Sequence, residues 1–143
     1  MKTYLVKGLD TRQLQQVDSL LHLLSPRANR IDAERVSRLI AQERIFLFVA
    51  EDENHDIIGM LTLCPCQTLA KEKLWIEDVI VDDNYRGRGI GRLLVQEAIS
   101  HAKSIAPGNV LYLTSNPTRK AARTLYKSEG FEEYETGVFR MKL

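Results

Sequence analysis

The residues best suited to chemistry in this chain lie in the segment "RGRGIGR", Arg86–Arg92, which holds three glycines and three arginines. An apolar strand pattern precedes the segment, and an amphipathic helix pattern follows it without a break. A helix N-terminus presents free backbone N–H groups and the positive end of the helix dipole. Glycine lets a phosphate approach those groups closely, and arginine adds charge and donors. The segment therefore predicts a phosphate-binding turn rather than an ordinary strand-to-helix connection.

Two other phosphate-binding motifs do not fit this segment. A Walker loop requires Lys-Ser or Lys-Thr after its last glycine, whereas "RLL" follows Gly91. A dinucleotide-binding fingerprint reads Gly-x-Gly-x-x-Gly, whereas the spacing here is Gly-x-Gly-x-Gly. The chain also lacks a second nucleotide-binding half. The bound phosphate is therefore expected to belong to another kind of ligand.

Two adjacent acidic residues, Glu77 and Asp78, interrupt the apolar strand pattern "LWIEDVIV" just before this turn. Charged residues are seldom buried without a partner, so their position is unusual. Strand alternation places the two side chains on opposite faces, and only one of them can then face a given cleft. Such a carboxylate can act as a general base or form a structural salt bridge. The residues alone leave both roles open.

The elements that must position these groups follow from periodicity and turn signals. Strands are predicted at 3–9, 44–52, 56–67, 73–81 and 109–115, helices at 10–24, from Asp32 onward, at 91–105 and at 117–130, and a C-terminal hairpin at 131–143 around Thr136-Gly137. Consecutive strands followed by alternating helices and strands predict a mixed sheet with helices packed on it. No linker or repeat divides the chain, so residues 1–143 are expected to form one domain. Trp75, Tyr112 and Phe139 are expected in the core.

The composition excludes several classes of function. The chain has 143 residues and a net charge of +1, with 44% hydrophobic and 27% charged residues. This balance offers no basic stripe for nucleic acid, and the apolar runs are too short to cross a membrane. The N-terminus lacks the apolar core of a secretory signal, so a cytoplasmic location is expected. The two cysteines, Cys64 and Cys66, have no histidine nearby in sequence, and no metal site is expected.

Two motifs carry a resemblance to a known family. The segment "VDDNYRGRGIGRLLVQEAI", Val81–Ile99, resembles the acetyl-CoA-binding motif Arg/Gln-x-x-Gly-x-Gly/Ala of the GNAT superfamily of N-acetyltransferases. Arg86, Gly89 and Gly91 occupy its fixed positions. The segment "AARTLYKSEGF" resembles the second motif of the superfamily, an apolar helix ending in Tyr followed by Gly-Phe. The order of elements matches as well, so the resemblance extends over essentially the whole chain.

The resemblance implies a fold and a cofactor site. The fold would be a single-domain α/β structure: a mixed, mostly antiparallel central sheet with helices on both faces and a splayed parallel strand pair, here 73–81 and 109–115. The backbone at Val79 and Val81 would pair with the pantetheine arm and acetyl carbonyl of acetyl-CoA. The coenzyme A pyrophosphate would be held by the N–H groups of Arg86, Gly87, Arg88, Gly89, Ile90, Gly91 and Arg92.

The resemblance also implies the catalytic groups. Tyr126 matches the tyrosine that protonates the departing thiolate, a transfer favoured because thiols ionise near ~8.5 and tyrosine near ~10. As an alternative, Tyr126 is a core residue. Many relatives carry an asparagine seven residues before this tyrosine, where this chain has Arg119. Asn116 is then expected to contact the pantetheine from the strand end. Glu77 is expected to deprotonate the amine through a water, with Asp78 as the other candidate.

The implied function is direct acetyl transfer from acetyl-CoA, used as co-substrate, to a primary amine in a ternary complex. The acceptor is a small molecule or a peptide, and a homodimer is compatible with such a chain. Arg27 and Arg30 either bind an acidic group of the acceptor or are simply solvated. The competing interpretation is a non-catalytic acyl-CoA-binding sensor or scaffold module.

Overall fold

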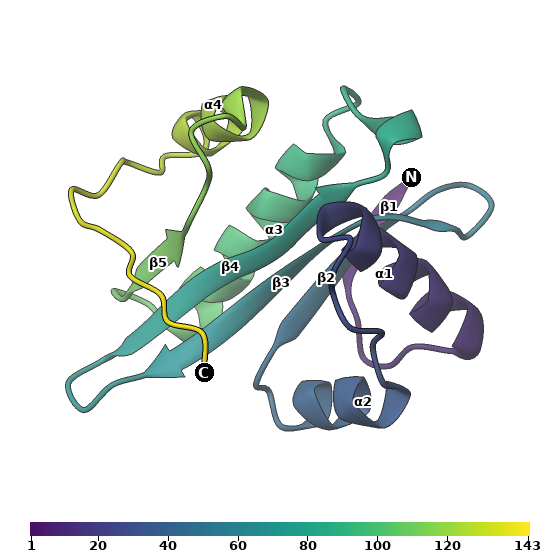
Figure 1. Cartoon of the computed structure of the whole chain (residues 1–143), viewed down its shortest axis with the longest axis horizontal. Helices are drawn as coiled ribbons and strands as arrows, with labels where there is room; N and C mark the ends of the chain where they lie inside the picture. The colour runs from purple at the N-terminus through teal and green to yellow at the C-terminus, as the bar shows by residue number, and fades with distance from the viewer.

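The computed structural model describes residues 1–143 and contains five strands, four α-helices and one short 3₁₀ helix (Figure 1). In chain order the elements are β1 (Lys2–Leu5), α1 (Thr11–Leu24), α2 (Ala33–Ala41), β2 (Phe46–Glu51), β3 (Ile57–Gln67), β4 (Glu72–Val81), η1 (Asp83–Tyr85), α3 (Ile90–Ile105), β5 (Val110–Leu113) and α4 (Lys120–Ser128). The sheet order is β1-β2-β3-β4-β5; all neighbours are antiparallel except β4 and β5, which are parallel. The predicted mixed, mostly antiparallel sheet is confirmed.

Helices cover both faces of the sheet, and each face has its own apolar core. Figure 1 shows α1 and α2 on one face and α3 on the other. Beneath α1, Val17 and Leu20 pack against side chains of β2, β3 and β4. On the opposite face, Leu94 and Val95 of α3 and Tyr126 of α4 belong to the larger core cluster. The two faces are called the α1 face and the α3 face below.

The four helices differ in how their N-termini are capped. The Asp10 side chain accepts from the Gln13 N–H at 2.8 Å and caps α1, and Asp32 accepts from the Arg35 N–H at 2.7 Å and caps α2. The N-cap residues of α3 and α4 are Gly89 and Arg119, and neither provides a side-chain cap. The backbone N–H groups at the start of α3 are therefore open to an external acceptor, whereas at α4 the Lys120 N–H donates to the Thr118 carbonyl at 3.0 Å and only the following amides are open.

The parallel strands β4 and β5 separate partway along their length. They are paired from Lys73↔Val110 to Ile76↔Leu113, where β5 ends. β4 continues through Glu77–Val81 toward η1, paired with β3 but with no strand on its other side, while the chain after β5 turns away to α4 (Figure 1). The predicted splayed parallel pair is confirmed. The region that comprises Glu77–Val81, the end of β5 and the N-termini of α3 and α4 is named the cleft below.

The predicted C-terminal hairpin is wrong. Residues 131–143 form no strand, because Glu133 is held by Arg123 and Lys127 of α4 and Tyr134 packs edge-on against Tyr112 of β5. These contacts draw the segment toward α4 and β5 instead of onto itself. The expectation of a core position for Phe139 fails with it, since this side chain is 97% exposed.

Candidate active site

The glycine-rich turn leaves its backbone amides free. Gly87 and Gly89 have positive φ angles, 77° and 79°, and no atom lies within 4 Å of a Cβ built on either one. The first amide after the turn to bond back into the helix is Leu93, which donates to the Gly89 carbonyl at 3.1 Å. The preceding amides point into open space at the positive end of α3. This arrangement fits the phosphate-binding role predicted for the segment.

Three arginines of this turn have different surroundings. Arg86 pairs with Asp83 at 2.7 Å and donates to the Val81 carbonyl at 3.3 Å. Arg92 pairs with Glu129 at the end of α4. Arg88 forms no ion pair; it lies over the Tyr85 ring and donates to a loop carbonyl. Of the three, Arg88 therefore has the charge most available to an anion.

The upper half of β4 offers an unpaired backbone edge beside this turn. No strand pairs with Val79 or Val81 on the β5 side, because β5 ends opposite Ile76. Both valines pack their side chains against the α3-face core. Their side chains thus anchor the strand, and apart from the Val81 carbonyl, which accepts from Arg86, their backbone has no side-chain partner, as expected for residues that pair with an extended ligand arm.

Tyr126 is nearly buried and its hydroxyl has no protein partner. The residue is 9% exposed, its ring meets Phe131 edge-on, and none of the side-chain hydrogen bonds of the protein involves its hydroxyl. Burial raises the pKa of Tyr126 above its ordinary value, while the Arg119 charge acts in the opposite direction. Tyr126 is therefore a core residue by packing and at the same time an available proton donor.

Ser115 also carries an unpartnered buried hydroxyl oxygen, at the end of β5. Ser115 and Tyr126 both line a groove of about 1040 Å³ between β5, α4 and the C-terminal segment. An unsatisfied buried polar atom is costly, so the Ser115 oxygen indicates a site for a polar ligand in this groove. The neighbouring Asn116 uses its side-chain oxygen to accept from the Thr118 N–H at 2.9 Å, which leaves its amide nitrogen available to a ligand.

A β-bulge in β4 corrects the expectation that Glu77 and Asp78 point to opposite faces. The β3–β4 register shifts between Met60 and Thr62, and Asp78 has a positive φ of 51°. Ile76 and Val79 both belong to the α3 face although three residues separate them. The side chains of the two residues between them, Glu77 and Asp78, therefore point to the same face of the sheet.

Both carboxylates then project on the α1 face. Thr62, located between two side chains of the α3-face core, must point to the opposite face, and its hydroxyl donates to Asp78 Oδ2 at 2.9 Å. Burial, and secondarily the Asp78 charge, raises the pKa of Glu77. The same pair of carboxylates, together with burial as the largest cause, raises the pKa of the Cys64 thiol. The structure thus brings a more basic carboxylate to the edge of the cleft and keeps the nearest thiol protonated.

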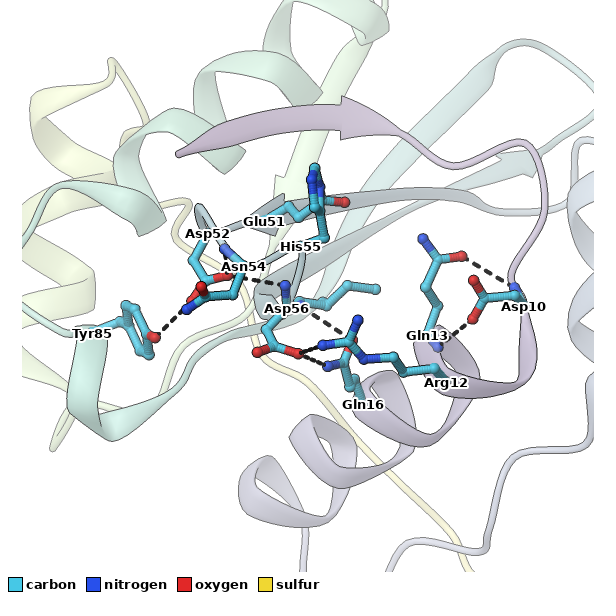
Figure 2. A network of polar contacts seen from close by, with 11 residues as sticks. Asp10, Arg12, Gln13, Gln16, Glu51, Asp52, Asn54, His55, Asp56 and Tyr85 are labelled. Carbon is cyan, nitrogen blue, oxygen red and sulfur yellow. Dashed lines mark hydrogen bonds and ion pairs between the residues drawn. The ribbon is translucent and has the colours of Figure 1, made fainter.

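A second polar cluster was not predicted from sequence. At the β2–β3 turn, Asp56 accepts from Arg12 at 2.6 Å and from Gln16, both on α1 (Figure 2). The Tyr85 hydroxyl donates to Asp52 at 2.8 Å. Backbone bonding from Asp56, followed by this tyrosine bond, lowers the pKa of Asp52. We call these five residues the turn network. The turn network could not be predicted from the sequence, because 40 residues or more separate Asp56 from its partners on α1.

The arginines of the α1–α2 loop form no ion pair or hydrogen bond with the cleft residues named above. Arg30 pairs with Asp18 of α1 at 3.3 Å, and Arg27 is exposed. Asp18 also accepts from the Ile31 N–H at 2.9 Å, so this carboxylate holds the loop against α1.

No group of three or more His, Cys, Asp or Glu side chains with metal-binding geometry is present, and both cysteines are free. No helix is both long and apolar enough to cross a membrane.

Comparisons with known proteins give a consistent result. The sequence matches the acetyltransferase (GNAT) family over residues 14–131. It is 40% identical to the N-alpha-acetyltransferase RimI of Mycobacterium tuberculosis, over 72% of this chain and 74% of that protein. It is 36% identical to an uncharacterized N-acetyltransferase of Methanocaldococcus jannaschii, over 72% of this chain but only 47% of the archaeal protein.

The fold is shared with solved structures. An aminoglycoside acetyltransferase from an uncultured soil metagenomic sample, solved in complex with sisomicin, superposes with a TM-score of 0.84. The match covers 99% of this chain and 95% of that one, at 22% sequence identity. This likeness shows the arrangement of helices and strands.

Proposed function

Because the chain belongs to the acetyltransferase (GNAT) family, we propose that it is an N-acetyltransferase that uses acetyl-CoA as co-substrate. The acetyl group passes to a primary amine by direct attack while both substrates are bound. One observation carries the proposal: the free amides of the glycine-rich turn follow directly after the part of β4 that no strand pairs on the β5 side.

The cofactor-binding residues follow from these groups. The backbone N–H groups of Arg86–Arg92 bind the pyrophosphate, with Arg88 adding an unpaired charge. The backbone of Val79 and Val81 pairs with the pantetheine arm, and the Asn116 amide nitrogen donates to it. Acetyl-CoA supplies an acetyl group activated as a thioester; the residues named here position it.

Tyr126 and Glu77 act as acid and base. Tyr126 donates its proton to the departing sulfur, which its unpartnered hydroxyl supports. Glu77, on the α1 face of the β4 bulge, takes a proton from the acceptor ammonium through a water. Its raised pKa supports this role, because a stronger base takes an amine proton more readily.

The first acceptor class to test is a peptide N-terminus. The relative named as an N-alpha-acetyltransferase is 40% identical to this chain, whereas the aminoglycoside acetyltransferase is 22% identical. A cationic amine suits the paired carboxylates of Glu77 and Asp78. A small-molecule amine is the second class.

A homodimer forms part of the proposal. Several large apolar side chains of the C-terminal segment are exposed: Tyr134, Val138, Phe139, Met141 and Leu143. A second copy of the chain would remove them from water. Sedimentation velocity measures this directly, and a monomer at all concentrations would contradict it.

The decisive experiment combines binding with turnover. Calorimetry with acetyl-CoA tests the cofactor site, and a panel of short peptides with free or blocked N-termini, alongside aminoglycosides, tests for thiol release. The enzyme proposal requires binding and release with at least one free amine. Binding without release across the panel would favour the acyl-CoA sensor, and absence of binding would reject both functions.

A further inference from the structure

Arg119 is an unpaired cation at the N-terminus of α4, where it precedes Tyr126 by seven residues. It is exposed and belongs to no ion pair. Seven residues correspond to nearly two helical turns, so positions 119 and 126 lie on the same side of α4. Helical side chains lean toward the N-terminus, which directs the Tyr126 ring toward the Arg119 end of the helix.

Three other cations of α3 and α4 each pair with a carboxylate. On α3, Arg92 pairs with Glu129. On α4, Arg123 and Lys127 both pair with Glu133 of the C-terminal segment. Arg119 differs from these three cations in having no carboxylate partner, whereas Arg123 and Lys127 share the single carboxylate of Glu133.

The α4 N-terminus adds to this positive potential. No side chain caps it, and helix dipoles place partial positive charge at that end. The Tyr126 hydroxyl has no partner although the residue is 9% exposed. An uncapped helix end, a free arginine and an unpartnered phenol thus occupy one side of the cleft.

We infer that the Arg119 guanidinium stabilises the negative charge shared by the Tyr126 oxygen and the departing sulfur during acetyl transfer. This inference rests on the proposed acetyl transfer. As the amine nitrogen bonds to the acetyl carbon, the carbon–sulfur bond breaks and the sulfur leaves with the electron pair. The sulfur takes the Tyr126 proton, so the charge moves to the phenolate.

The protons balance over the reaction. The acceptor ammonium loses two protons: one leaves to solvent through Glu77, and the other replaces the proton that Tyr126 donated. From the breaking of the carbon–sulfur bond until Tyr126 regains a proton, one negative charge resides on sulfur or on the phenolate, and Arg119 acts on both positions. Arg119 thus influences the reaction through Tyr126, and it is a positioning residue rather than a catalytic one. The opposing effects of burial and of Arg119 on the pKa of Tyr126 agree with this role.

The test measures the ionisation of Tyr126 in the free protein, without any acceptor. Tyrosine labelled with ¹³C at Cζ is titrated by NMR, and the Tyr126 signal is identified by its absence in Tyr126→Phe. A unit charge at ~10 Å shifts a pKa by about 0.3 to 1 unit at effective dielectric constants between ~80 and ~20. Arg119→Gln should raise the Tyr126 midpoint by that amount, and Arg119→Lys should restore it.

Lys120→Gln is the matched control, because it removes the neighbouring charge at the same helix end. It should leave the Tyr126 midpoint in place. High salt should move the wild-type midpoint toward that of Arg119→Gln, since exposed charges are screened. In single-turnover assays Arg119→Gln should slow acetyl transfer roughly 2- to 10-fold, with unchanged acetyl-CoA affinity by calorimetry.

Equal Tyr126 midpoints in wild type and Arg119→Gln would overturn the inference, as would an equal shift in Lys120→Gln. A shift in Arg119→Gln that Arg119→Lys does not restore would assign the effect to structure rather than to charge, and would also overturn it. Failure of the wild type to bind acetyl-CoA would instead reject the proposed function. The two failures are therefore distinguishable.

Discussion

The turn network and the cleft border the same sheet, but they differ in whether their polar groups have hydrogen-bond partners within the protein. In the turn network, Asp56 accepts from two side chains of α1, and the Tyr85 hydroxyl donates to Asp52 (Figure 2). On the cleft side, in the groove between β5 and α4, the Tyr126 hydroxyl and the Ser115 oxygen have no partner. The capping of helices follows the same division: α1 and α2 are capped by aspartates, whereas α3 and α4 are not.

This difference separates structural polar groups from functional ones. An unsatisfied buried donor or acceptor costs free energy, so a fold keeps it where a ligand completes the bonding. The polar groups of the turn network are paired with one another within the protein. The cleft is incomplete, and a phosphate-bearing thioester would supply the missing partners. Each prediction below perturbs one side of this comparison.

The largest effect is expected from Gly89→Val. The valine Cβ would occupy the open space over the free amides, and acetyl-CoA affinity should fall by at least roughly 10²-fold. Gly108→Val is the matched control, since Gly108 has a φ of 78° and equally open surroundings in the α3–β5 turn. Both variants place valine at a positive φ, so the melting temperatures of the two should fall by similar amounts. Equal acetyl-CoA affinity by calorimetry in the two would show that the cleft amides bind no phosphate.

Tyr126→Phe should have the next largest effect, on turnover. Removal of the hydroxyl deletes the proposed acid, and turnover should fall roughly 10²-fold while acetyl-CoA binding and melting temperature are retained. Tyr4→Phe provides the contrast, because the Tyr4 hydroxyl donates to Glu51 at 2.8 Å and this bond contributes to raising its pKa to about 12. That variant should lose stability and keep turnover. Wild-type turnover in Tyr126→Phe would make Tyr126 a core residue only.

Glu77→Gln should have a smaller effect that depends on pH. In wild type, kcat/KM should rise through a midpoint above the ordinary glutamate range, because burial and the Asp78 charge raise the pKa of Glu77. The variant should lose roughly 10²-fold below the pKa of the acceptor and recover above it, where the free amine is abundant. Asp78→Asn should move the midpoint to lower pH, since it removes the neighbouring charge. An unchanged profile in Glu77→Gln would indicate a structural carboxylate.

Features with a local signal could be predicted from the sequence. Apolar periodicity gave the order of strands and helices, and the alternating glycines located the turn whose amides are free. The bulge at Asp78 had no such signal. Most residues with a positive φ are glycines, which are visible in the sequence, but here an aspartate adopts the positive φ. The consequence was that Glu77 and Asp78 were placed on opposite faces.

Long-range charge pairing explains the other differences. The C-terminal segment has turn residues typical of a hairpin, but Glu133 pairs with Arg123 and Lys127 on the preceding helix. The turn network likewise joins α1 to the β2–β3 turn. Local patterns contain no information about which distant charge a carboxylate meets, so these contacts required the structure.

His101 is the exception that tests the comparison, and it should give the smallest effect. Its Nε2 is buried without a partner, yet it lies on α3 between Phe46 and Phe48, with ring centroids at 4.5 and 5.6 Å, away from the cleft. Burial, with a smaller contribution from Lys7, lowers the pKa of His101, and Glu43 opposes the shift. The folded pKa is then below the unfolded value of about 6.5, so stability is fully present above pH ~6.5 and is lost as the pH falls through the folded pKa.

Urea unfolding of wild type should show this loss, at most about 1.4 kcal/mol per pH unit for one proton. His101→Leu should flatten the dependence and leave acetyl-CoA affinity unchanged. If His101→Leu instead weakens acetyl-CoA binding, an unpartnered polar atom would mark the ligand site even here, and the division between structural and functional groups would have to extend along α3.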